Sequence, residues 1–164
     1  MYLTLIDTIV LWIHVFSAIF FVGGSFFIWV VVVPASFKIT DDEKLRTRIV
    51  GLIGKQFALY TNISLVILIV SGIYNATWYL NYDFLALFNT TGGNILLVKI
   101  ILVGAMILIM YGNNIYHGKR IMQMVREGRM DELRKLRKWS HMLSFITLGL
   151  MIAIIFAAVA LEFY

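Results

Sequence analysis

The chain has 164 residues, of which 61% are hydrophobic and only 14% are charged, and its mean hydropathy is +0.89. A soluble protein of this size would have to expose much of that apolar surface to water, so a soluble globule is excluded. The sequence contains no cysteine, which excludes disulfides, thiolate metal sites and thiol catalysis. These properties predict an integral membrane protein with a single domain over residues 1–164.

Four apolar segments follow one another along the chain and predict the membrane spans. They cover about residues 8–33, 57–79, 95–115 and 142–161. As helices they are about 30 to 39 Å long, enough to cross a hydrocarbon core of about 30 Å. Their apolar residues are continuous rather than alternating, which favours helices over a β-barrel. We therefore predict an all-α fold, an integral membrane four-helix bundle of up-down topology.

Basic residues gather in two of the three connections between the spans. Residues 38–55 contain five Lys or Arg and residues 117–138 contain eight, whereas residues 80–93 contain none. By the positive-inside rule, the two basic loops are cytoplasmic and both termini lie outside. This topology in the cell membrane, together with anionic lipid, accounts for the net charge of +5 without nucleic acid.

Local signals within the basic loops predict where helices begin and end. Pro34 lies where the first helix meets the cytoplasm. Thr40 and Glu43 have the spacing of a capping box, which predicts that the second helix begins there. Further along, Gly128 predicts a helix stop, and the acidic pair at 131–132 predicts the first turn of the last helix.

Ionisable side chains inside the spans are costly and are therefore functional candidates. His14 lies about six residues into the first span and Lys99 about five residues into the third, and both helices descend from the outside. Asn75, near the outer end of the second span, reaches a similar depth. We predict an outer-leaflet polar pocket of His14, Asn75 and Lys99, approached by Glu162. The alternative is that Lys99 snorkels outward and His14 bonds to a neighbouring helix.

By helical spacing, His14 and Asn75 each share a helix face with further small or polar residues, and such a face suits the bundle interior. The face of His14 continues through Ser17, Ala18, Phe21 and Ser25. The most polar stripe of the second span consists of Ser64, Ser71, Asn75 and Trp78.

A second group of candidates lies at the cytoplasmic rim. His117 ends the third helix and His141 opens the fourth. Lys99 and His117 are five turns apart and share one azimuth, with Met106 and Met110 close to that line. The alternatives are interfacial histidines beside lipid phosphate and methionines that serve only core packing.

Heme b and copper are the two cofactors that these residue types allow. Heme b needs neutral imidazoles that face a flat apolar slot. His14 and His141 differ too much in depth to bind one iron, which leaves His14 with an open sixth position near Lys99, or His117 with His141. Covalent c-type heme is excluded by the lack of cysteine. His and Met also suit monovalent copper, although no Met-x-x-Met or His-x-His group occurs.

With these residues in place, the chain resembles the membrane superfamily of CopD-type copper-resistance proteins and HemJ-type protoporphyrinogen oxidases. The resemblance covers essentially the whole chain. It rests on Leu-Trp-Ile-His at 11–14, Val-Gly-Gly-Ser-Phe at 22–26, Pro34, Ser-Gly at 71–72 and Asn-Ile-Leu-Leu-Val-Lys at 94–99.

The two branches of the superfamily imply different functions. HemJ-type proteins imply heme b with a first-helix His and a third-helix Lys, which correspond to His14 and Lys99. Where they have a Tyr-His pair, this chain has Tyr111-Gly112, and their basic-Asn-Glu-Pro segment is missing. CopD-type proteins imply copper uptake into or across the membrane, often with a periplasmic copper-binding partner.

Three functions follow as hypotheses, in this order. The first is a b-type heme membrane protein in electron transfer or porphyrin redox chemistry, with Lys99 steering a propionate, carboxylate substrate or quinone. The second is a CopD-type copper carrier, in which His14 with Met106 and Met110 handles the monovalent ion. The third is a non-catalytic small subunit of a membrane complex. Partners are the lipid bilayer and either such a complex or further copies of the chain.

The expected site residues are a catalytic Lys99, a cofactor-binding set and two metal ligands. The cofactor-binding set is His14, Asn75, Lys99, His117 and His141, and the metal ligands are His14 and His141.

Overall fold

A computed structural model describes residues 4–163 of the chain, without the side chains of residues 118, 119, 121, 122, 125, 126 and 130. Lys119 and Arg126 of the second basic loop are therefore outside the described side chains. Four helical stretches are long and apolar enough to cross a membrane, namely Leu5–Ile39, Glu43–Tyr79, Thr91–His117 and Asp131–Phe163. The all-α fold with four long apolar helices is confirmed. The chain divides into two units, residues 1–84 and 85–164.

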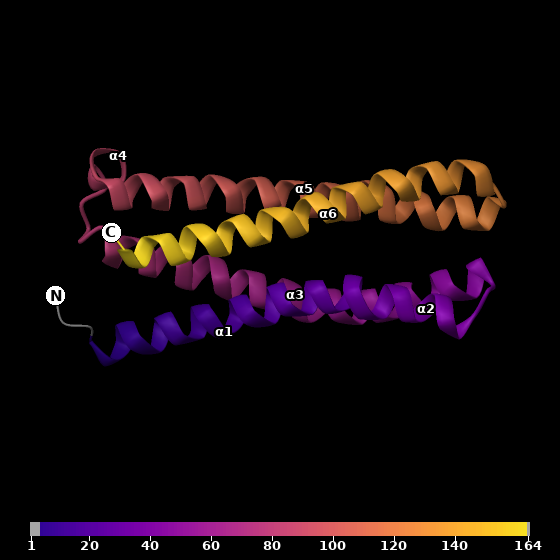
Figure 1. Ribbon diagram of the computed structural model, residues 1–164, viewed down its shortest axis with the longest axis horizontal. Coiled ribbons are helices and arrows are strands. Elements are labelled where there is room, and N and C mark those ends of the chain that lie inside the picture. Colours follow the sequence, from indigo (N-terminus) through magenta and orange to yellow (C-terminus); the bar gives the residue numbers. More distant parts are fainter. Residues whose placement is uncertain (1–3, 164) are drawn as a thin grey trace. The chain divides into compact units, whose positions relative to one another are not determined.

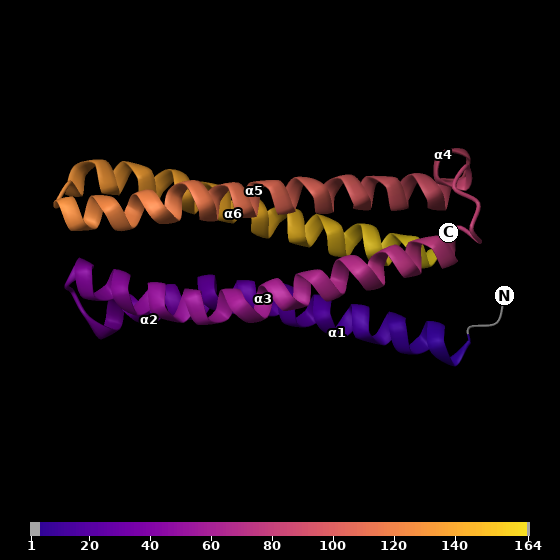
Figure 2. The ribbon, with the colours of Figure 1, turned by 180° about the vertical axis from the view of Figure 1, so that it is seen from behind.

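The first unit is a helical hairpin (Figure 1). Its first arm consists of α1 (Leu5–Phe27), the π-helical segment η1 (Ile28–Val32) and α2 (Val33–Ile39), and its second arm is α3 (Glu43–Tyr79). Both α1 and α2 pack against α3, and the two arms lie side by side from either view (Figure 2). Thr4 begins α1 with a capping box, since its hydroxyl accepts from the Asp7 N–H and its own N–H donates to the Asp7 carboxylate.

Pro34 lies inside the first helical arm rather than at its end. Proline has no N–H to donate and its ring collides with the carbonyl four residues earlier, so an undisturbed α-helix cannot pass through it. The wider turns of η1 stand immediately before Pro34, and the helix then continues as α2 to Ile39. The first arm therefore extends beyond the predicted end at residue 33.

The second arm begins at a different cap from the one predicted. The Asp42 side chain accepts from the Lys44 N–H at 2.8 Å, and α3 starts at Glu43. Thr40 instead accepts from the Asp42 N–H at 3.1 Å, a local turn in the link between α2 and α3. The capping box predicted from Thr40 is wrong because Asp42 is a strong N-cap acceptor that lies closer to the helix.

The second unit is also a hairpin, preceded by a short helix that the sequence did not predict. It contains α4 (Ala86–Asn89), α5 (Thr91–Glu127), α6 (Met130–Ala160) and the 3-10 turn η2 (Leu161–Phe163). Gly128 ends α5 with a φ of 69°, a left-handed conformation that favours glycine, and the acidic pair at 131–132 lies in the first turn of α6. These two predictions are confirmed.

Large apolar side chains are exposed along all four long helices, including Phe16, Val66, Leu108 and Phe156. Such a surface is stable in hydrocarbon and not in water. The protein is a multi-pass membrane protein with a lipid environment.

Candidate functional site

His14 faces α3 and contacts it through one ring nitrogen. Its Nδ1 is 2.8 Å from the Ser71 hydroxyl oxygen, which is itself 2.6 Å from the Ile67 carbonyl. A carbonyl oxygen only accepts, so the single Ser71 proton is donated to Ile67. Ser71 must then accept from His14, whose proton is on Nδ1. In the neutral form of the ring, this bond selects the tautomer with the lone pair on Nε2.

Close approach of the helices holds this ring against α3. A Cβ added at Gly72 would lie only 3.1 Å from Cε1 of His14. Further along the same hairpin, the Phe57 ring fills the space where a Cβ on Gly24 would stand. Glycine at these two positions lets aromatic rings pack on the backbone of the facing helix.

Asp7 and Tyr74 also join α1 to α3, near the end of the hairpin that is predicted to lie outside. Asp7 is buried, and Tyr74 donates its phenolic proton to the Asp7 carboxylate at 2.8 Å. Thr4 donates to the second carboxylate oxygen. Sequence reasoning missed this pair, although Asp7 is two turns from His14 and therefore on the same face.

The predicted polar faces of the first hairpin are confirmed by burial. Ser17 and Phe21 are buried on α1, and Ser64 and Ser71 are buried on α3. His14 makes the cross-helix bond that the alternative expectation described, and this bond uses Nδ1.

The predicted outer pocket draws on both units. His14 and Asn75 belong to the first unit, and Asn75 is partly buried one turn from Ser71. Lys99 is partly buried on α5, and Glu162 is exposed in η2, both in the second unit. The pocket that would join these residues stays a prediction.

Asn113 links the two helices of the second hairpin. Its Nδ2 donates to the Ser140 carbonyl and to the Ser144 hydroxyl, both at 3.2 Å. Ser144 donates its own proton to the Ser140 carbonyl at 3.0 Å. Asn113 is 8% exposed, and its Oδ1 is buried without a hydrogen-bond partner in the described part of the chain. Sequence reasoning did not select Asn113. It could have been found as an amide side chain inside an apolar helix, one turn before His117.

The two rim histidines have different surroundings. His117 packs edge-on against the Tyr116 ring, and its Nδ1 is buried without a hydrogen-bond partner among residues 4–163 as described. His141 lies at an exposed position on α6, next to Ser140. No group of three or more His, Asp or Glu able to hold a metal occurs among the described residues. A shared His117–His141 site stays a prediction.

The methionines predicted to line α5 are directed inward to different degrees. Met106 is 4% exposed and Met110 is partly buried. Met151 on α6, which sequence reasoning did not select, is 3% exposed.

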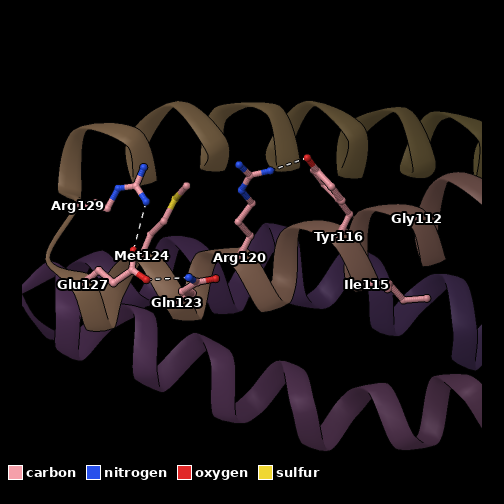
Figure 3. Close-up of a pocket in the computed structure, with 8 residues that line it drawn as sticks. All are labelled: Gly112, Ile115, Tyr116, Arg120, Gln123, Met124, Glu127 and Arg129. Carbon is pink, nitrogen blue, oxygen red and sulfur yellow. Dashed lines mark hydrogen bonds and ion pairs between the residues drawn. The ribbon is translucent and has the colours of Figure 1, made fainter.

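A groove of about 670 Å³ is lined by α5 from Gly112, near the end of the apolar span, to Glu127, together with Arg129 (Figure 3). Arg120 donates to the Tyr116 hydroxyl at 2.6 Å, and Gln123 donates to Glu127 at 2.7 Å. The bonds from Gln123 and Arg129 lower the pKa of the exposed Glu127 carboxyl. None of the predicted site residues lines this groove.

Comparison with known proteins gives one family. The family model of copper resistance protein D, CopD, matches residues 52–161. The matched region includes Ser71, Lys99, His117 and His141, and His14 lies before it. No curated protein and no solved structure matches the chain.

Proposed function

The chain belongs to the copper resistance protein D family, and we propose that it binds monovalent copper within the membrane, with Nε2 of His14 as a ligand. The observation that carries this proposal is the bond between His14 and Ser71. A metal ligand needs a neutral imidazole whose other nitrogen is held by a second group, because that bond fixes both the tautomer and the ring plane. Ser71 meets this requirement from the facing helix.

The oxidation state follows from the membrane environment. Moving a single positive charge into a low-dielectric span costs less than moving two, which favours Cu⁺ over Cu²⁺. Imidazole nitrogen and thioether sulfur are both ligands of Cu⁺. The buried Asp7 carboxylate, two turns outward from His14, would favour a cation at this end of the hairpin.

The proposed role of this copper binding is transport of copper into or across the membrane, as the CopD-type resemblance implies. In this role Asn75, His117 and His141 are further candidate contacts for the ion. Lys99 does not suit a copper site when protonated, since its positive charge repels the ion. Its candidate role is contact with an anionic group.

A b-type heme protein is the second candidate function, and the same observation favours it. An axial ligand to heme iron is also a neutral imidazole that presents its lone pair from one nitrogen. Lys99 would then pair with a heme propionate, a carboxylate substrate or a quinone. The two candidates differ in the metal and in the absorption spectrum.

Metal analysis and one absorption spectrum of the full chain, purified after growth with copper and heme, test both candidates. We expect bound copper, no Soret band, and one copper fewer per chain in His14→Ala. The control is Ser64→Ala, which removes a buried polar side chain from the same helix as Ser71 and should leave copper in place.

Each of the other outcomes has a definite meaning. Unchanged copper in His14→Ala would overturn the assignment of His14. A Soret band that disappears in His14→Ala would replace copper by heme. Neither copper nor heme in the wild-type chain would favour the third hypothesis, a small subunit of a larger complex.

A further inference from the structure

The hydrogen bonds of Asn113 set the register between α5 and α6. Asn113 reaches Ser144 across the antiparallel pair, and seven residues make about two helical turns. Two turns from Asn113 toward the start of α5 lies Met106, and two turns from Ser144 toward the end of α6 lies Met151. The register therefore places Met106 opposite Met151. Contact between α5 and η2 shows that the pairing continues beyond this level.

Burial agrees with this placement. Met106 and Met151 are 4% and 3% exposed, whereas Leu108 and Ile152 on the same helices are 75% and 56% exposed. Met110 lies one turn from Met106 on the same face of α5, at a spacing that brings Cβ atoms to about 5–6 Å. Two thioether side chains are thus placed opposite each other across the seam between α5 and α6, and the third lies one turn away on α5.

At the Met110 end of this group, a buried acceptor oxygen has no donor within the described structure. Asn113 is three residues beyond Met110, so its side chain is on the adjoining turn. Its amide nitrogen is directed at α6, and its buried Oδ1 has no hydrogen-bond partner within the described structure. A buried acceptor oxygen of this kind is costly unless a donor or a cation lies near it. Apolar packing alone does not account for it.

We propose that Met106, Met110 and Met151 form a second site for monovalent copper, within the α5–α6 hairpin. The chain has no cysteine, so thioethers are its only sulfur ligands, and soft sulfur selects Cu⁺ over harder divalent ions. Three neutral ligands leave the ion with its single charge, and the buried Asn113 oxygen is an unsatisfied acceptor on the turn next to Met110. The proposal rests on the proposed function in one respect, that the chain handles copper, and it does not use His14.

The test is titration of the detergent-solubilised full chain with Cu⁺ against bicinchoninate under reducing conditions, with X-ray absorption on the loaded protein. The variant is M106L together with M151L, because Met and Leu have similar volumes and the hairpin should still pack. We expect this variant to bind one Cu⁺ fewer per chain and to lose sulfur from the copper coordination shell. Met142→Leu is the matched control at a 44% exposed position and should bind as wild type does.

The His14→Ala protein separates the two sites. It should lose the nitrogen-bound copper and keep the sulfur-bound copper, and thermal unfolding should show that every variant is folded. Copper bound by wild type without sulfur in its shell would overturn the thioether site and leave the proposed function standing. Unchanged stoichiometry in the double variant would also overturn it. A wild-type chain that binds no Cu⁺ would overturn the proposed function together with the second site.

Discussion

At His14, the ligand-binding state of the ring depends on a neighbour that touches no metal. Ser71 accepts from Nδ1 because its own proton is committed to the Ile67 carbonyl. Without the Ser71 oxygen, the ring proton could reside on either nitrogen, and only one tautomer presents Nε2. Ser71 is a positioning residue, and its contribution is expected in metal affinity rather than in stoichiometry.

Replacing Ser71 by Ala is expected to weaken copper binding at His14 by about 10-fold to 100-fold, the range for loss of an outer-shell partner. Ser64→Ala is the matched control, since Ser64 is equally buried on the same helix two turns away. Competition titration with Cu⁺ compares the two variants. Equal affinities in Ser71→Ala and Ser64→Ala would contradict the positioning role.

Helical spacing was enough to predict which side chains share the face of His14. Ser17 and Phe21 are buried as expected, and so is Ser71 on the facing helix. The contact between Asp7 and Tyr74 was missed because Asp7 precedes the apolar run and was considered only as a charge. Depth in the membrane could be compared for His14 and Lys99, but sequence spacing carries no information on how separate helices approach each other.

At the scale of the elements, the space around each glycine shows whether the helix is in close contact with its neighbour at that point. Gly23 and Gly24 are neighbours on α1, yet a Cβ at Gly23 would meet nothing within 4 Å and a Cβ at Gly24 would run into the Phe57 ring. Phe57 also packs on Phe20 with ring centroids 6.2 Å apart. The ring is therefore constrained on two sides, and one added methyl group has little room.

Gly24→Ala is expected to destabilise the fold by about 1–3 kcal/mol, the usual cost of overpacking. Gly23→Ala should be neutral or stabilising by about 0.5–1 kcal/mol, because alanine is the better helix former. Thermal unfolding of both proteins in the same detergent measures the difference. A Gly24→Ala protein as stable as Gly23→Ala would show that α3 does not hold the Phe57 ring in this position.

Helix ends were predicted well where one residue dictates the backbone and poorly where several side chains compete. Gly128 was sufficient, because its left-handed φ of 69° ends a helix by itself. Thr40 and Asp42 both offer an acceptor oxygen, and the one adjacent to the helix was used. The passage through Pro34 could not be predicted, since a proline more often ends a helix than follows a π-helical turn.

For the molecule as a whole, hydropathy and charge predict the four spans and the orientation. Long apolar runs were enough to predict the spans. A continuous apolar run can cross lipid only as a helix, because its backbone polar groups must pair within the segment. The orientation rests on the basic residues of the two hairpin turns and on their absence from residues 80–93. It remains a prediction, and the absence of cysteine makes it simple to test.

Single cysteines at Lys44, Phe84 and Lys135 should report the orientation. A membrane-impermeant maleimide added to intact cells is expected to label only Phe84→Cys, which lies in the middle loop and is 64% exposed. All three should be labelled after permeabilisation, because Lys44 and Lys135 are exposed near the starts of α3 and α6. Labelling of Lys44→Cys on intact cells would reverse the assigned topology.

The π-helical segment η1 gives the first span a place where its length can change by one residue. A π turn contains more residues than an α turn, so deleting one residue between 28 and 32 would restore a regular α-helix. The wider turn already absorbs the extra residue, so the side chains after the deletion would keep their faces. Ser36, which is 1% exposed and bonds to the Val33 carbonyl, would stay buried, and His14 would not move. Chains that lose this residue would keep the same buried face on both sides of η1 and differ only in the width of one helical turn.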